Sequence, residues 1–134
     1  MTENHEKISS VSKGRDRAAM ILMLIAALGA AFAFVSSIGV ARLASAATQQ
    51  VEWWRVMGFL LFTLLFVFLA IAPRKYPGLW ELILIDKGAL TLIEFVLAKN
   101  PATNALSPAI IDGILTIIIL AAYLLARGYT SWKK

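Results

Sequence analysis

Four ionisable residues stand inside the apolar stretch LWELILIDKGALTLIEFVLA, which runs from Leu79 to Ala98. They are Glu81, Asp86, Lys87 and Glu94. An ionisable group at the centre of a bilayer costs at least about 2.5 kcal/mol on insertion scales, so such groups usually face protein or water. The stretch is long enough to cross a bilayer. We therefore expect a membrane helix that turns its polar side chains towards neighbouring helices.

The spacing of these residues gives the helix a polar face. Lys87, Thr91 and Glu94 follow one another at i, i+4 and i+7, which places them on one side, whereas Asp86 is rotated about 100° from Lys87. Glu81 lies near the first end of the helix, where Arg74 and Lys75 can pair with it. The middle of the helix therefore predicts a buried polar site.

A second polar pair lies in the last apolar stretch of the chain. Asp112 and Thr116 share one helix face, and Asp112 lies at the depth of Glu94, each about one turn from the outer end. Five charged side chains are expected to converge in the outer half of the bundle: Arg55, Asp86, Lys87, Glu94 and Asp112. Two cations would then face three carboxylates, which leaves a net negative charge or one shared proton.

Two interpretations of this polar group stay open. It is either an ion-pair network that fixes the helix register, or a pocket that opens outward and handles protons or a polar head group. In the pocket, Glu94 or Asp112 would act as general acid or base, and Lys87 or Arg55 would stabilise negative charge. Binding contacts are expected from Arg55, Asp86, Thr91 and Thr116.

Several kinds of site are not expected. The chain has no Cys and one His, His5, so thiol chemistry, zinc and haem are unlikely classes. A carboxylate metal site from Asp86, Glu94 and Asp112 would have to compete with Lys87 for the same oxygens. We predict no cofactor and no metal, so an enzyme of this kind would be an acid–base isomerase or cyclase.

The composition indicates a membrane protein. Of 134 residues, 60% are hydrophobic and 16% charged, and the mean hydropathy is +0.76, which is too apolar for an ordinary soluble domain. The net charge of +5 arises mostly from basic residues beside apolar runs, so topology explains it better than a nucleic-acid partner.

The hydropathy pattern predicts an all-α bundle of four membrane helices within residues 18–127. The helices are expected at about residues 18–41, 55–72, 79–98 and 108–126, between a flexible tail (1–17) and a basic tail (128–134). Ser107 followed by Pro108 is typical of a helix start.

The basic residues predict the orientation. Most lie in the tails and the 73–78 loop, so both termini are expected in the cytoplasm of a multi-pass plasma (inner) membrane protein. Ala44–Ala46 resembles a signal-peptidase site, but the preceding apolar run is long and Arg42 interrupts it, so we expect a spanning helix there.

Three short pieces resemble the DoxX-like group of small four-helix membrane proteins. They are the opening of the second helix at 55–58, Arg-Val-Met-Gly, the pair Asp86-Lys87, and Asp112-Gly113 early in the fourth helix. The resemblance implies a four-helix bundle with polar residues gathered towards one end. It also implies a family of mostly unassigned functions, with some members associated with redox or quinone-linked complexes.

Three functions are compatible with these observations. We expect binding, and conceivably transformation, of a small hydrophobic or amphiphilic molecule that enters from the membrane lipid. The first alternative is a non-catalytic subunit or assembly factor of a larger membrane complex. It would dock through a stripe of small residues on the first helix: Ala26, Ala30, Ala33 and Ser37. The second alternative is a proton-coupled small transporter that acts as a homo-oligomer.

Overall fold

The computed structural model describes residues 11–133, and this part of the chain is all-helical. It contains four α-helices: α2 (Lys13–Leu43), α3 (Gln49–Ile71), α4 (Leu79–Leu97) and α5 (Leu106–Ala126). Two short 3-10 helices follow α4 and α5: η1 (Pro101–Thr103) and η2 (Gly128–Trp132). The predicted all-α, four-helix class is confirmed. His5 and the rest of residues 1–10 lie outside the described chain.

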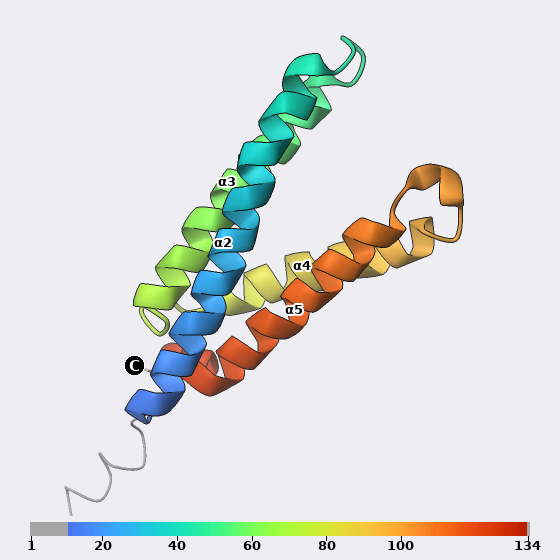
Figure 1. Ribbon diagram of the computed structural model, residues 1–134. Helices are drawn as coiled ribbons and strands as arrows, with labels where there is room; N and C mark the ends of the chain where they lie inside the picture. The colour runs from blue at the N-terminus through green and yellow to red at the C-terminus, as the bar shows by residue number, and fades with distance from the viewer. Residues whose placement is uncertain (1–10, 134) are drawn as a thin grey trace, which may run out of the picture.

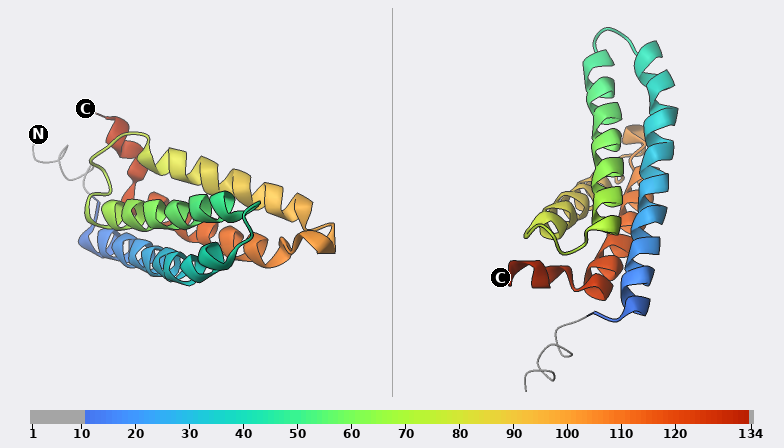
Figure 2. Two further views of the ribbon diagram at one scale, coloured as in Figure 1. Left: turned by 90° about the horizontal axis from the view of Figure 1, so that it is seen from above. Right: turned by 90° about the vertical axis from the view of Figure 1, so that its left-hand side faces the viewer.

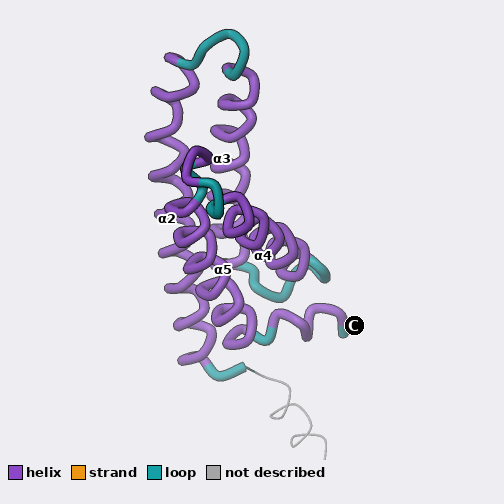
Figure 3. Tube along the Cα trace, turned by 90° about the vertical axis from the view of Figure 1, so that its right-hand side faces the viewer, coloured by secondary structure: helices purple, strands orange, loops and turns teal. Residues whose placement is uncertain are grey.

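The helices form two hairpins that diverge from a common end (Figure 1). At this end, here called the vertex, α2 begins, α3 passes into α4, and α5 ends in η2 (Figure 2). Figure 3, seen from the side of α4 and α5, shows these two helices projecting out of the plane of α2 and α3. The hairpins meet mainly along α2 and α5, and the V opens towards the loops 44–48 and 98–105 (Figure 1).

Three helices, α2, α3 and α5, are long and apolar enough to cross a membrane. Large apolar side chains on their outer faces suit a lipid environment: Leu28 and Phe32 of α2 are 72% and 77% exposed. The 19 residues of α4 are interrupted by four charged residues, and α4 is not among the three. A fourth membrane span therefore stays a prediction.

Two segments expected to be tails are helical. Ser12 caps α2, its side chain accepting a hydrogen bond from the Arg15 amide, so residues 13–17 form the first turns of α2 rather than a flexible tail. At the other end, residues 128–132 form η2. Both segments pack at the vertex, and such contacts are what sequence patterns show least well.

The fourth helix begins at Leu106, two residues before the expected start. Ser107 is not its cap, because Ala105 holds that position. The turn before it is instead built by Asn100, whose side chain accepts from the Ala102 amide at 3.1 Å, and by Asn104 in the left-handed conformation. Pro108 lies inside the first turn, where its missing N–H has no intrahelical partner to lose.

Arg74 joins three elements at the vertex. Its guanidinium donates to both carboxylate oxygens of Asp16 in α2, at 2.7 and 2.8 Å, and to the Ala126 carbonyl of α5 at 2.8 Å. The Asp16 carboxylate raises the pKa of Arg74. Arg15 adds a bond from α2 to the Leu124 carbonyl of α5 at 2.8 Å. These bonds fix the lower ends of the two hairpins together.

The sequence predicted that Glu81 pairs with Arg74 or Lys75, and the structure shows different partners for Glu81. Its Oε1 atom accepts from the Tyr123 hydroxyl at 2.9 Å and from the Trp132 indole at 3.2 Å. Arg74 is occupied by Asp16, which is 58 positions away in the chain. The carboxylate of Glu81 thus ties η2 to α4 and α5 instead of forming an ion pair at the loop.

Trp80 is the centre of the packing at the vertex. Its side chain is fully buried, its Nε1 donates to the Pro73 carbonyl at 2.6 Å, and its ring lies 5.9 Å from that of Tyr123. Gly128 lies against both rings. A Cβ atom at Gly128 would stand 2.6 Å from Trp80 Cδ1 and 2.6 Å from Tyr123 Cδ2.

Gly128→Ala is therefore expected to lower the free energy of unfolding by about 1–3 kcal/mol, because neither the buried Trp80 ring nor the partly buried Tyr123 ring can move without losing a partner. The matched control is Gly39→Ala in α2, where a Cβ meets nothing within 4 Å and where alanine favours the helix. Thermal unfolding in mild detergent compares the two variants. Equal unfolding temperatures would contradict the packing described here.

Candidate functional site

A cavity of about 390 Å³ lies between the two hairpins. Its walls come from α2, α3 and α5, and α4 contributes a single residue, Lys87. Among residues 11–133, Lys87 and Asp112 are the only charged residues that line it. The apolar lining comprises Ile25, Ala26, Gly29, Ala30, Ala33, Phe59, Phe62, Phe66, Pro108, Ile111, Ile114, Leu115 and Ile118. A mostly apolar cavity with a few polar groups is the usual form of a small-molecule site.

Lys87 reaches the cavity from α4 with its side chain 92% buried, since only 8% is exposed. Its Nζ atom lies 3.8 Å from Asp112 Oδ1 and 3.8 Å from Asp86 Oδ2. The same atom lies 3.8 Å from the centre of the Phe62 ring, in a cation–π contact. The ammonium is therefore held by charge and by a ring face.

In both ion pairs of Lys87 the distance between Nζ and the carboxylate oxygen exceeds that of an N–H···O hydrogen bond, which is about 2.7–3.2 Å. An ammonium carries three N–H donors. Within residues 11–133 these donors have no partner at hydrogen-bond distance. A buried donor without a partner is costly, so Lys87 presents unused hydrogen-bonding capacity at the cavity.

Glu94 lies beside Asp112 across the interface of α4 and α5. Its Oε2 atom is buried and has no hydrogen-bond partner among the described residues. Unlike Asp112, Glu94 does not line the cavity. The sequence predicted that these two carboxylates lie at the same depth, and in the structure they lie side by side.

Three predicted binding residues face away from the cavity. The side chain of Asp86 is 55% exposed, because its helical position is rotated from that of Lys87. The hydroxyls of Thr91 and Thr116 lie 3.4 Å apart and bond the Lys87 and Asp112 carbonyls of their own helices. These threonines line a separate groove between α4 and α5.

Arg55 does not join the polar group. Its ion pair is with Glu52, three residues earlier in α3, and its side chain is half exposed. The first turns of α3 lie at the end of its hairpin that is farthest from the vertex, where the two hairpins have diverged (Figure 1). The expectation that Arg55 converges with the α4 and α5 charges rested on equal depth in a closed bundle, and the V shape removes that condition.

Without Arg55, one cation faces three carboxylates: Lys87 against Asp86, Glu94 and Asp112. Full ionisation would leave two negative charges uncompensated. The balance of charge at the cavity wall is different, because Lys87 and Asp112 line the cavity and the other two carboxylates do not. There the protein presents one positive and one negative group.

Phe59, Phe62 and Phe66 are site residues that sequence reasoning missed. They recur at i, i+3 and i+7, so they share one face of α3, and all three line the cavity. The small residues of α2 have the same role: Ala26, Ala30 and Ala33 form the opposite wall. Both patterns are visible in the sequence, but an apolar helix face gives no sign of whether it meets a neighbour or a cavity.

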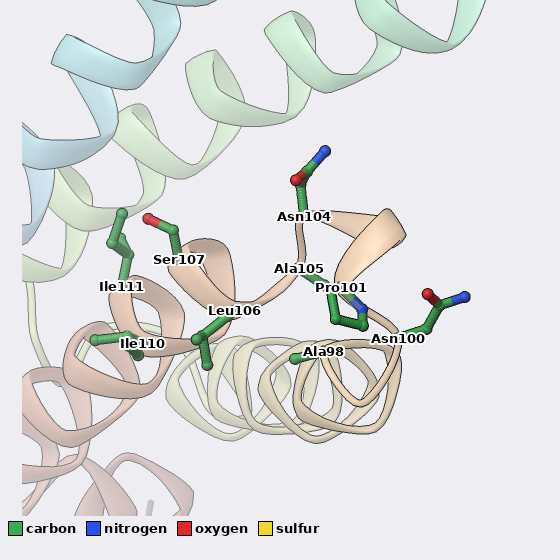
Figure 4. Close-up of a pocket in the computed structure, with 9 residues that line it drawn as sticks. All are labelled: Ala98, Asn100, Pro101, Asn104, Ala105, Leu106, Ser107, Ile110 and Ile111. Carbon is green, nitrogen blue, oxygen red and sulfur yellow. The ribbon is translucent and has the colours of Figure 1, made fainter.

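A second concavity, of about 560 Å³, lies at the loop between α4 and α5 (Figure 4). No charged residue lines it. The amide groups of Asn100 and Asn104 point away from Leu106 and Ile110 (Figure 4), and Asn100 is already used as the cap of the turn. This concavity lacks the buried polar group that distinguishes the cavity between the hairpins.

No protein-family model matches the chain, and neither a curated protein nor a solved structure gives a match. The resemblance to DoxX-like proteins therefore stays a prediction.

Proposed function

We propose that this protein binds a small hydrophobic or amphiphilic molecule in the cavity between its two hairpins. The observation that carries the proposal is the Lys87 ammonium, which is nine-tenths buried in an apolar cavity and has unused donors. A cation in such a place is expensive unless something polar meets it. The apolar walls supply the remaining binding energy, at about 25 cal/mol per Å² of apolar surface buried.

The ligand enters from the bilayer in this proposal. The hairpins diverge away from the vertex (Figure 1), and the residues around the cavity belong to helices with lipid-compatible outer faces. We further propose that α4 crosses the membrane with the other three helices, which gives a multi-pass protein with both termini in the cytoplasm. Its burial of Lys87 supports that placement.

Acid–base chemistry at this cavity would use Asp112 rather than Glu94, because Asp112 lines the cavity and Glu94 does not. Lys87 would stabilise a developing negative charge on the ligand. Isomerisation or cyclisation of the ligand is the class of reaction that these groups support without a cofactor.

The stripe of small residues on α2 favours ligand binding over docking to a larger complex. Ala26, Ala30 and Ser37 are buried within the chain, and Ala26, Ala30 and Ala33 line the cavity. A surface that is covered internally is not available to a partner subunit.

Gly29→Phe is expected to abolish retention of the ligand. Gly29 lines the cavity, and a Cβ atom added there meets nothing within 4 Å, so a phenyl ring built on it can take up volume that the ligand would occupy. Native mass spectrometry and lipid extraction of protein purified in mild detergent would measure what is retained.

Gly39→Phe is the matched control, because Gly39 lies on the same helix, is equally open, and does not line the cavity. We expect wild type and Gly39→Phe to retain the same small molecule and Gly29→Phe to lose it. Equal retention by all three proteins would overturn the proposed cavity, and so would the absence of any specific molecule from wild type.

A further inference from the structure

Two charged side chains line the cavity within the described residues, Lys87 of α4 and Asp112 of α5, and their charged atoms lie 3.8 Å apart. We propose that this pair selects a lipid alcohol: a neutral amphiphile whose head group is a hydroxyl. This inference rests on the proposed function, since it specifies the class of molecule that the cavity takes.

The pair disfavours head groups that carry a full charge. A charge within hydrogen-bond distance of one partner lies within roughly 7 Å of the other, because the partners are themselves so close. An anion that binds Lys87 is then repelled by Asp112, and by Glu94 beside it. A cation that binds Asp112 is repelled by the Lys87 ammonium, and the carboxylates of Glu94 and Asp86 offset part of that repulsion. In an apolar cavity, water screens these repulsions poorly.

A hydroxyl satisfies both partners at once. It donates one hydrogen bond and accepts others, so it can accept from the Lys87 ammonium and donate to the Asp112 carboxylate. The separation of 3.8 Å is too long for a direct bond but allows one oxygen to lie about 2.7–2.9 Å from each charged atom. The pair therefore leaves room for an oxygen that contacts both charged atoms.

A bridging water has the same hydrogen-bonding pattern, and a hydroxyl that replaces it reproduces both bonds. The apolar walls decide between the two, because only the alcohol carries a chain that fills the space between Phe59, Phe66 and Ile118. A head group without a hydroxyl would displace the water and leave the ion pair unbridged.

The experiment compares four probes that share an 18-carbon chain: oleyl alcohol, oleyl phosphate, oleylamine and the hydrocarbon octadecene. Binding of each to the purified full chain is measured by native mass spectrometry over a concentration series. We expect oleyl alcohol to bind about tenfold or more tightly than the other three, which corresponds to the loss of about one bridging hydrogen bond.

Lys87→Met removes the donor of the bridge and is expected to abolish the preference for the alcohol. Asp112→Asn replaces the charged acceptor with a weaker, neutral one and is expected to reduce the preference. Arg55→Gln is the control, because it removes a charge that lies outside the cavity and pairs with Glu52. Circular dichroism of each variant shows whether its helices form. If Lys87→Met fails to fold, Lys87→Arg provides a further test. It keeps a cation and N–H donors at this position, so it should keep the preference for the alcohol.

The possible outcomes separate this inference from the proposed function. Tighter binding of oleyl phosphate or oleylamine would overturn the alcohol class and leave the cavity as a ligand site. Equal binding of octadecene and oleyl alcohol would also overturn it, since the walls alone would then account for binding. If none of the probes binds and wild type also retains no molecule of its own, the proposed function fails as well.

Discussion

Trp80→Ala is expected to lower the free energy of unfolding by about 3–5 kcal/mol, the range for truncating a large buried aromatic side chain. The indole is fully buried and contacts three parts of the vertex. It donates to the Pro73 carbonyl in the loop before α4, packs in a tilted arrangement against the Tyr123 ring of α5, and lies against Gly128. Its removal leaves a void where the two hairpins are joined.

The same substitution should also weaken ligand retention, although Trp80 does not line the cavity. The vertex sets the angle between the hairpins, and that angle determines the distance between the α2 and α3 walls and Lys87. A looser vertex therefore widens the distribution of cavity shapes and lowers the fraction of molecules that are ready to bind.

Trp80→Phe is the control for this prediction. It keeps most of the ring packing and removes the bond to Pro73, so its expected cost is about 1–2 kcal/mol. Unfolding in mild detergent gives the stabilities, and native mass spectrometry gives the retained ligand. If Trp80→Ala were no less stable than Trp80→Phe, the vertex would not depend on this packing.

The arrangement of helices could be predicted in part from the sequence. Apolar runs of the right length gave the number and type of the helices, because that signal depends only on local composition. The vertex could not be predicted, since the bond from Arg74 to Asp16 joins residues 58 positions apart. A basic residue beside Glu81 in the chain is a poor guide to its partner when Tyr123 and Trp132 are brought closer by folding.

The candidate site was likewise predictable only where one helix sufficed. The i, i+4 rule placed Lys87 and Thr91 in successive turns of α4, and matching depth brought Glu94 to Asp112. Arg55 was misplaced, because equal depth implies contact only in a closed bundle. Although Lys87 and Thr91 share a helix face, Lys87 lines the cavity and Thr91 lines the groove. A helical wheel cannot separate these two environments, because they are formed by the neighbouring helices.

The second large effect is expected at Lys87. Lys87→Met should lower the free energy of unfolding by about 3 kcal/mol, because it leaves the Asp112 carboxylate, whose side chain is only 18% exposed, without its cation. Methionine keeps the unbranched stem but lacks the ammonium, so the loss reports on the ion pairs and on the cation–π contact with Phe62. Asp112→Asn should cost less, since Asp86 still lies 3.8 Å from the ammonium.

The double variant Lys87→Met/Asp112→Asn distinguishes a structural role of the ion pair from a role in binding. Replacing both charges removes the uncompensated carboxylate, so we expect at least about half of the lost stability to return. Ligand retention should not return, because the ammonium donor is gone and the neutral amide of asparagine holds a hydroxyl more weakly than the carboxylate does. Unfolding in mild detergent and native mass spectrometry on the same four proteins complete the cycle. Recovery of both stability and retention would mean that the pair only compensates its own charges, whereas a double variant as unstable as Lys87→Met would mean that it fixes the packing of α4 on α5.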